Sequence, residues 1–225
     1  MLAWRMYVDS SNDTLPPAWN NLYKQPTADG RPWITGSLDF SAGNTSNTDI
    51  NRDITRSLLW PYCGKSPGIW KCPADQSTVY SPSTVSFLPR VRSISMNGWL
   101  GSTDVAGYSS GNYRIFEKGH KIVNPSMTWA FLDEREDSIN DGELVVSMNG
   151  CDPAAASARM IVDYPASYHC GSCGVSFTDG HAEIHKWRDP RTTPALNKGQ
   201  PLSHVVSSPD NIDVLWLQQR STVPQ

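Results

Sequence analysis

The stretch Gly174-Val-Ser-Phe-Thr-Asp-Gly-His-Ala-Glu-Ile-His-Lys-Trp187 decides the expected fold. Polar and apolar residues alternate on both sides of Asp179-Gly180, which is the period of a β-strand. An Asp-Gly pair between two such runs is a strong signal for a hairpin turn. The sequence therefore predicts two antiparallel strands, at 174–178 and 181–187.

Further strands are expected upstream of this hairpin. Residues 128–132 and 143–147 are rich in apolar residues of the kind that favour strands. Asp141-Gly142 predicts a second hairpin turn just before 143–147. Residues 93–99 predict a short strand that ends in a turn at Asn97-Gly98. We expect these strands to form one antiparallel sheet.

Helices are expected mainly before the strands. Residues 1–8 read as the last turns of a helix with an abrupt start, as if a longer helix had been cut. Residues 50–61 predict a second helix, capped by Thr48 or Asp49, with an apolar face formed by Ile50, Ile54, Leu58 and Leu59. An amphipathic stretch lies around 214–217.

Together these patterns predict an α+β fold in one loop-rich domain over 1–225. Residues 1–10 are expected to be the end of a truncated N-terminal helix, and 188–225 a C-terminal extension. In the expected fold, the N-terminal helix and the helix at 50–61 pack on the antiparallel sheet.

Charge and hydropathy exclude two classes of protein. The chain has 225 residues, with 19 Lys and Arg against 22 Asp and Glu, so its net charge is −3. This balance argues against a nucleic-acid partner, which selects for a basic excess. No apolar run approaches the ~18 residues of a membrane span, so we expect a soluble chain without a membrane partner.

The five cysteines leave several arrangements open: Cys63, Cys72, Cys151, Cys170 and Cys173. An odd number leaves at least one thiol unpaired in a monomer. Cys63 and Cys72 flank a short Gly- and Pro-containing segment that a disulfide can close. Free thiols are the alternative, and a zinc site drawing on Cys63, Cys72, Cys170 and Cys173 is less favoured because the spacing is wrong for a zinc knuckle.

The densest acidic cluster lies between Asp133 and Gly142. Calcium takes six to eight oxygen ligands in a flexible geometry, and Asp137, Asn140 and Asp141 offer several within one turn. The alternative is a solvated acidic turn whose side chains accept hydrogen bonds from local backbone amides.

Two histidine patterns suggest acid–base or metal chemistry. His169 lies ten positions before Asp179, and we expect two strands joined by a turn to bring them near each other or near the acidic cluster between Asp133 and Gly142. His181, Glu183 and His185 alternate on one strand face, where they are suited to zinc binding or proton transfer. The alternative is a polar, solvent-facing surface, with Ala182 and Ile184 pointing inward.

Nine tryptophans are spread along the chain. Such scattered tryptophans are typical of core packing. A platform for stacking on sugars is the alternative.

Several motifs, in order, resemble one family. They are Trp4-Arg-Met-Tyr7 before Leu15-Pro16, Trp70-Lys-Cys-Pro-Ala-Asp75, Ser95-Met-Asn-Gly98, Phe131-Leu-Asp-Glu134, Asp137-Ser-Ile-Asn-Asp-Gly142, and His169 followed after nine residues by Asp179-Gly180. The series resembles the prepilin-like "H-X9-DG" proteins, which are related to type II secretion pseudopilins, over most of residues 2–187. Members usually begin with a leader and a long apolar anchor helix, from which this sequence departs.

The resemblance implies a pseudopilin-like fold, an extracytoplasmic location, and partners among pilin-like or secretion subunits. Related pseudopilins bind calcium in a C-terminal loop. By that resemblance we expect calcium, rather than zinc, on Asp133, Glu134, Asp137, Asn140, Asp141 and Asp179.

Three functional hypotheses follow. The first is a calcium-stabilised, non-catalytic, pseudopilin-like domain associated with type II secretion or surface assembly. The second is a metal-dependent hydrolase of glycans or esters that uses His169, Asp179 or Glu134, or pairs Asp133 with Glu134. The third is a carbohydrate-binding module with a polysaccharide partner and exposed tryptophans.

Overall fold

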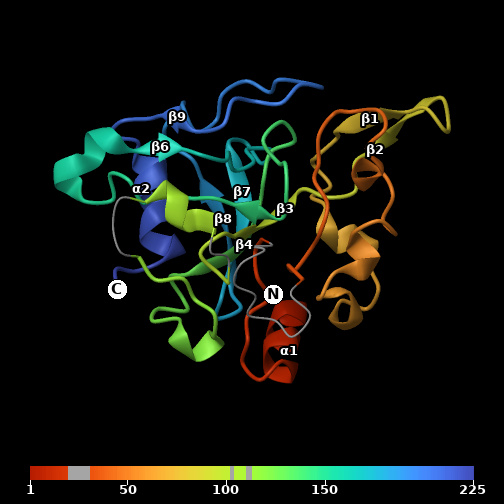
Figure 1. Cartoon of the computed structure of the whole chain (residues 1–225). Coiled ribbons are helices and arrows are strands. Elements are labelled where there is room, and N and C mark those ends of the chain that lie inside the picture. Colours follow the sequence, from red (N-terminus) through yellow and green to blue (C-terminus); the bar gives the residue numbers. More distant parts are fainter. Residues whose placement is uncertain (20–30, 102–103, 110–112) are drawn as a thin grey trace.

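A five-stranded mixed sheet runs through the middle of the molecule (Figure 1). The computed structural model describes residues 1–19, 31–101, 104–109 and 113–225. The strand order is β5-β3-β4-β7-β8. The bounds are β3 (Ile94–Asn97), β4 (Trp129–Asp133), β5 (Glu143–Leu144), β7 (Ser172–Phe177) and β8 (Ala182–Lys186).

Four of the five strands are antiparallel neighbours, as the sequence predicts. β7 and β8 form the predicted hairpin around Asp179-Gly180, and Phe177 donates its backbone N–H to the carbonyl of His181 at 2.9 Å. β3 pairs with β4 and β4 pairs with β7. The chain turns directly after Asn97, as expected. The predicted α+β class is therefore confirmed.

The expected strand at 143–147 is wrong in length and in pairing. Only Glu143 and Leu144 form β5, and β5 runs parallel to β3 instead of following β4 in a hairpin. The carbonyl of Gly142 accepts hydrogen bonds from Met96 N–H at 3.0 Å and Trp33 Nε1 at 2.7 Å. These bonds hold the chain across β3. Beyond β5, the N–H of Val145 donates to the Asp163 carboxylate at 2.7 Å instead of to a strand.

Two α-helices accompany the sheet. α1 (Leu2–Ser10) confirms the predicted N-terminal helix and buries Trp4, Tyr7 and Val8. α2 (Ile212–Ser221) contains the amphipathic stretch at 214–217 and packs Leu217 into the core. The segment 188–225 thus contributes a helix to the packed interior.

The helix expected at 50–61 is not formed. Two 3-10 turns replace it, η2 (Ile54–Arg56) and η3 (Trp60–Tyr62), and Ser57 between them has extended backbone angles. The hydroxyl of Ser57 donates to the carbonyl of Trp33, and its oxygen accepts the N–H of Leu59. This bonding breaks the helical ladder, although Ile54 and Leu59 still reach the core.

The remaining elements are short. They are β1 (Thr78–Ser81), β2 (Ser86–Pro89), β6 (Met160–Ile161), β9 (Val206–Ser207), η1 (Thr45–Asn47), η4 (Pro67–Trp70), η5 (Asp104–Tyr108), η6 (Gly119–Lys121) and η7 (Pro153–Ala158). In the four described ranges, no helix has the length and apolarity needed to cross a membrane.

The buried apolar side chains form two main clusters. One joins α1 and the N-terminal half to the sheet and includes the stacked pair Trp33 and Trp70. The other joins α2 and the C-terminal half to the sheet and includes Trp129 and Phe177. None of the nine tryptophans is exposed, and Trp19, Trp60 and Trp216 are the half-buried ones. The tryptophans therefore pack in or against the core, as favoured from the sequence, and the alternative of a surface of exposed tryptophans is not formed.

Candidate functional site

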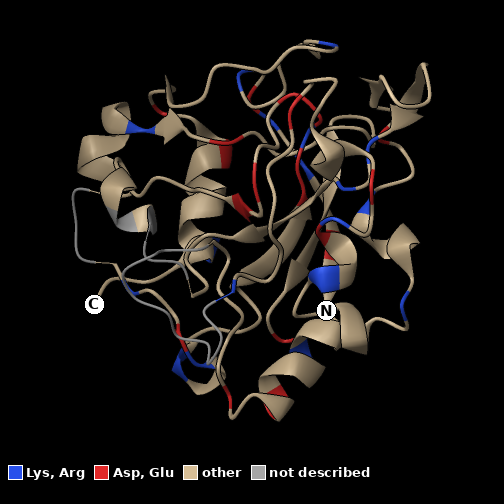
Figure 2. Cartoon of the chain, turned by 45° about the vertical axis from the view of Figure 1, so that its right-hand side comes forward, with Lys and Arg blue, Asp and Glu red and all other residues tan. Residues whose placement is uncertain are grey.

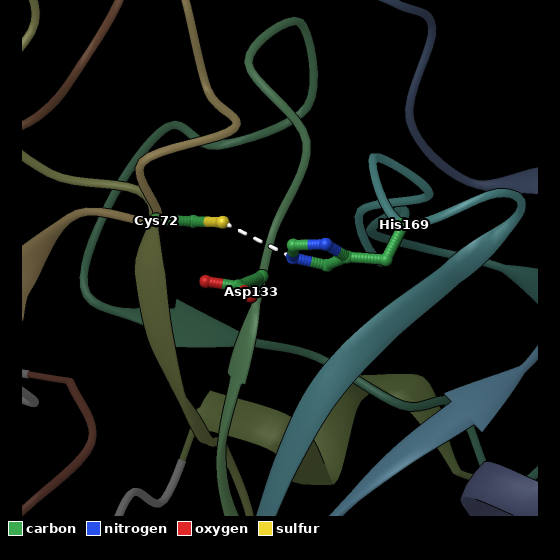
Figure 3. Close-up of side chains that lie close together, drawn as sticks. All are labelled: Cys72, Asp133 and His169. Carbon is green, nitrogen blue, oxygen red and sulfur yellow. Dashed lines mark hydrogen bonds between the residues drawn. The ribbon is translucent and has the colours of Figure 1, made fainter.

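Three segments that are distant in sequence meet at one end of β4 and β7. Cys72 follows η4, Asp133 is the last residue of β4, and His169 lies in the turn before β7. One sulfur, one carboxylate oxygen and one ring nitrogen from these residues all lie within 4.8 Å of one another. Cys72 Sγ and His169 Nε2 are 3.3 Å apart (Figure 3). We call these residues the Cys-Asp-His group.

Cys72 is buried and held by the turn that it begins. The N–H of Asp75 donates to the Cys72 carbonyl at 3.0 Å, and the Cys72 N–H donates to Ser93 Oγ at 2.8 Å. Burial raises the pKa of the Cys72 thiol, while backbone N–H groups of Ala74 and Asp75 bond to the sulfur and lower that pKa in part. Burial and the neighbouring carboxylates outweigh these bonds, so the raised pKa favours the neutral thiol unless a cation is bound.

Asp133 is also buried, where β4 leaves the sheet. Burial raises the pKa of its carboxyl group, and a hydrogen bond from the backbone N–H of Gly174 opposes that rise. Ser93 Oγ lies 3.5 Å from Asp133 Oδ1, so Ser93 contacts both Asp133 and Cys72. A buried carboxyl group beside a buried thiol has few ways to carry charge without a cation.

His169 is the exposed member of the group. It precedes Cys170 and Gly171, whose positive φ angles of 53° and 78° reverse the chain into β7. The N–H of His169 donates to the carbonyl of Ser172 at 3.2 Å. The ring is directed toward Cys72 and Asp133 (Figure 3), although His169 as a whole is exposed.

This donor set suits a transition metal. Zinc accepts thiolate, imidazole and carboxylate ligands in tetrahedral geometry, and three protein ligands leave the fourth position free. Calcium prefers an all-oxygen shell of six to eight ligands. The donors therefore fit zinc, with Cys72 and Asp133 supplying negative charge.

The expected calcium ligands do not converge. In the described part of the chain, the Cys-Asp-His group is the single set of three or more His, Cys, Asp and Glu ligand atoms that lie this close, and of the expected ligands only Asp133 belongs to it. Asp137 forms a buried ion pair with Arg135, with Nη2 and Oδ2 2.9 Å apart, and Asp141 accepts the N–H of Glu143 at 2.9 Å. Over the molecule as a whole, acidic and basic positions are interspersed (Figure 2).

Two further expected calcium ligands also lie elsewhere. Asn140 is exposed, and its carbonyl accepts the N–H of Leu38 at 2.6 Å. Asp179 is exposed and hydrogen-bonds His181 at 2.7 Å.

Asp133 and Glu134 do not form a carboxylate pair. Successive side chains of a strand point to opposite faces, and Glu134 accepts hydrogen bonds from Ser95 at 2.6 Å and Ser138 at 2.8 Å. Burial raises the pKa of Glu134 well above its ordinary value. The acid–base pair suggested by their adjacency is not assembled.

His169 and Asp179 lie at opposite ends of β7. The six residues of β7 separate them by roughly 17 Å of extended chain. His169 and Asp179 therefore do not meet, because the nine intervening residues are mostly strand. The other expected arrangement is formed for His169, which lies beside Asp133 of the acidic cluster.

The expected orientation of the β8 side chains, with Ile184 pointing inward and His185 toward solvent, is also wrong. Ile184 is 66% exposed, whereas His185 is half-buried and stacks on Trp216 with ring centres 3.7 Å apart. In the described ranges, no set of three close metal-ligating atoms includes His181, Glu183 or His185.

All five cysteines are free thiols, so the expected disulfide between Cys63 and Cys72 is absent. Cys63 lies 3.2 Å from the carbonyl of Trp60, and Cys170 is exposed. A four-cysteine zinc site is therefore not assembled either. Sequence analysis singled out Cys72 and His169 separately, but nothing in their spacing indicates that they meet.

No protein-family model, curated protein or solved structure matches this chain.

Proposed function

We propose that this chain is a metal-stabilised, non-catalytic, pseudopilin-like domain whose metal is a zinc-like ion on Cys72, Asp133 and His169. One observation carries the metal assignment: three donors from distant segments lie within 4.8 Å of one another. The ordered motif series supports the pseudopilin-like assignment. By that resemblance the domain acts outside the cytoplasm, with pilin-like or secretion subunits as partners.

Such an ion would tie together parts of the fold that are far apart in sequence. Cys72 and His169 are separated by 97 positions. Metal binding is coupled to folding, because the unfolded chain does not hold the ligands together. The ion would also neutralise the negative charge of a buried thiolate and a buried carboxylate.

The ligand chemistry determines which metal we propose. Sulfur and nitrogen donors favour zinc, and the carboxylates of the acidic turn are engaged by Arg135 and by backbone N–H groups. Zinc therefore replaces calcium as the proposed ion.

Elemental analysis of the purified protein after dialysis tests the proposal. About one zinc per chain is expected, and Cys72→Ser and His169→Ala should lose it. Cys63→Ser and His120→Ala are matched controls outside the group and should retain it. Equal zinc in all five proteins, or calcium in place of zinc, would contradict the assignment.

A metal-dependent hydrolase of esters or glycans is the second candidate. The observation in its favour is that the group has three donors, one of them the exposed His169, because a zinc ion with three protein ligands keeps a position that binds and activates water. Turnover of chromogenic esters or glycosides that is lost in His169→Ala would support it. We expect no turnover above that of the variant.

A further inference from the structure

Asp133, Gly174 and Ile184 lie in one row across strands β4, β7 and β8. The row begins at Asp133 of the Cys-Asp-His group. Leu132 pairs with Val175, so the next position along β4, Asp133, lies beside Gly174, whose N–H bonds its carboxylate. Gly174 in turn pairs with Ile184 of β8. Neighbouring strands are about 4.8 Å apart, so Ile184 lies roughly 10 Å from Asp133.

A groove of ≈ 390 Å³ follows this row on one face of the sheet. Its lining includes Ile94, Phe131, Asp133, Gly174, Ala182 and Ile184. Because Gly174 and Ala182 are small, the groove is not filled at these two positions. A Cβ on Gly174 would lie 3.5 Å from Asp133 Oδ2, so a large side chain there would fill the passage toward the metal ligands.

β8 is an edge strand whose outward backbone groups lack a strand partner. Phe177 N–H bonds His181 O at 2.9 Å and Trp187 N–H bonds Gly171 O at 3.0 Å. Bonding alternates along an antiparallel pair, so Ala182 and Ile184 direct their N–H and C=O groups away from β7. Within the described ranges, no neighbouring strand or backbone bond pairs these groups.

We propose that an extended, apolar peptide segment binds here as an added strand on β8. Its backbone pairs with Ala182 and Ile184, and its side chains on the groove face pack against these two residues where the groove reaches β8. This pairing does not rest on the proposed function.

A peptide fits this surface better than an acyl chain. An acyl chain would fill the apolar groove but would leave the outward N–H and C=O groups of β8 unbonded. Strand addition satisfies both features, because backbone hydrogen bonds give affinity and alternate side chains occupy the groove.

Fluorescence polarisation with a labelled eight-residue peptide of alternating Val and Lys tests the proposal on the zinc-loaded protein. Saturable binding is expected, with a loss of about tenfold or more in Gly174→Leu and in Ile184→Asp. Gly43→Leu, which faces open space, and Val123→Asp, at another exposed apolar position, are the matched controls. Two further peptides carry N-methyl groups on alternate residues, one on the odd and one on the even positions. They should differ in affinity, because only one set of peptide N–H groups faces β8.

The results separate this inference from the proposed function. Zinc content is measured on the same samples, and Ile184→Asp, which lies roughly 10 Å from Asp133, should retain its zinc. Unchanged peptide binding in Gly174→Leu and Ile184→Asp overturns the peptide site, whatever the zinc content. Binding of decanoate without binding of the peptide also overturns it. Wild-type protein without zinc overturns the metal assignment alone.

Discussion

Cys72 Sγ and His169 Nε2 lie 3.3 Å apart, although 97 positions separate the two residues in the chain. Asp133 completes the group from the end of β4. The three residues belong to three segments that the sheet alone does not join. A metal ion at this point would therefore stabilise the tertiary arrangement more than any single strand.

Removal of zinc should lower the thermal stability of the protein. A ligand at one hundred times its Kd stabilises the folded state by about 2.7 kcal/mol, and each kcal/mol shifts the Tm by roughly 2–4 °C in a chain of this size. Differential scanning calorimetry with zinc or with a chelator measures this shift. Cys72→Ser should show no zinc-dependent shift, while Cys63→Ser should behave like wild type. A zinc shift that persists in Cys72→Ser would contradict the site.

His204 should make stability depend on pH. Its hydrogen bond to Asp163, 2.8 Å long, raises the pKa of His204 above the ordinary value of 6.5. This contribution is fully present below about pH 6.5 and is lost as the pH rises through the raised folded value. Its size should be at the low end of roughly 1.5–3 kcal/mol, because the His204 side chain keeps 28% exposure.

Urea unfolding of wild type and His204→Gln across neutral pH measures this contribution. The wild type should lose stability relative to the variant as the pH rises. Parallel pH curves for the two proteins would refute the assignment.

Asn97 should tolerate no charge. It is fully buried, and its side-chain amide donates to the carbonyls of Trp129 and Ser221, both at 3.0 Å. Asn97→Asp would place a carboxylate against two carbonyl oxygens, so we expect a loss of at least about 3 kcal/mol. The exposed Asn140→Asp is the matched control, with a change within about 0.5 kcal/mol. Urea midpoints that fall equally in both variants would show that Asn97 does not join β3, β4 and α2.

Local patterns predicted the hairpin and the antiparallel strands, but not all of the connections. Asp179-Gly180 between alternating strands specifies its own partner, so β7 and β8 follow from the sequence. Asp141-Gly142 carries the same signal, yet hydrogen bonds from Met96 and Trp33 to Gly142 direct the chain across β3. These bonds come from distant residues, which no local pattern indicates.

The absence of the expected helix at 50–61 and the assembly of the Cys-Asp-His group were not predicted, for related reasons. The apolar spacing of Ile54 and Leu59 fits a helix, but the bond from Ser57 to Trp33 breaks it while both side chains stay in the core. Cys72, Asp133 and His169 belong to separate motifs. Only the tertiary packing of the turn after η4 against the sheet brings their side chains together.

X-ray absorption at the zinc edge of the zinc-loaded protein tests the central claim most directly. The Cys-Asp-His group predicts one sulfur at about 2.3 Å and nitrogen or oxygen ligands at about 2.0–2.2 Å. The sulfur signal should disappear in Cys72→Ser. A zinc shell without sulfur, or one with several sulfurs, would contradict the site.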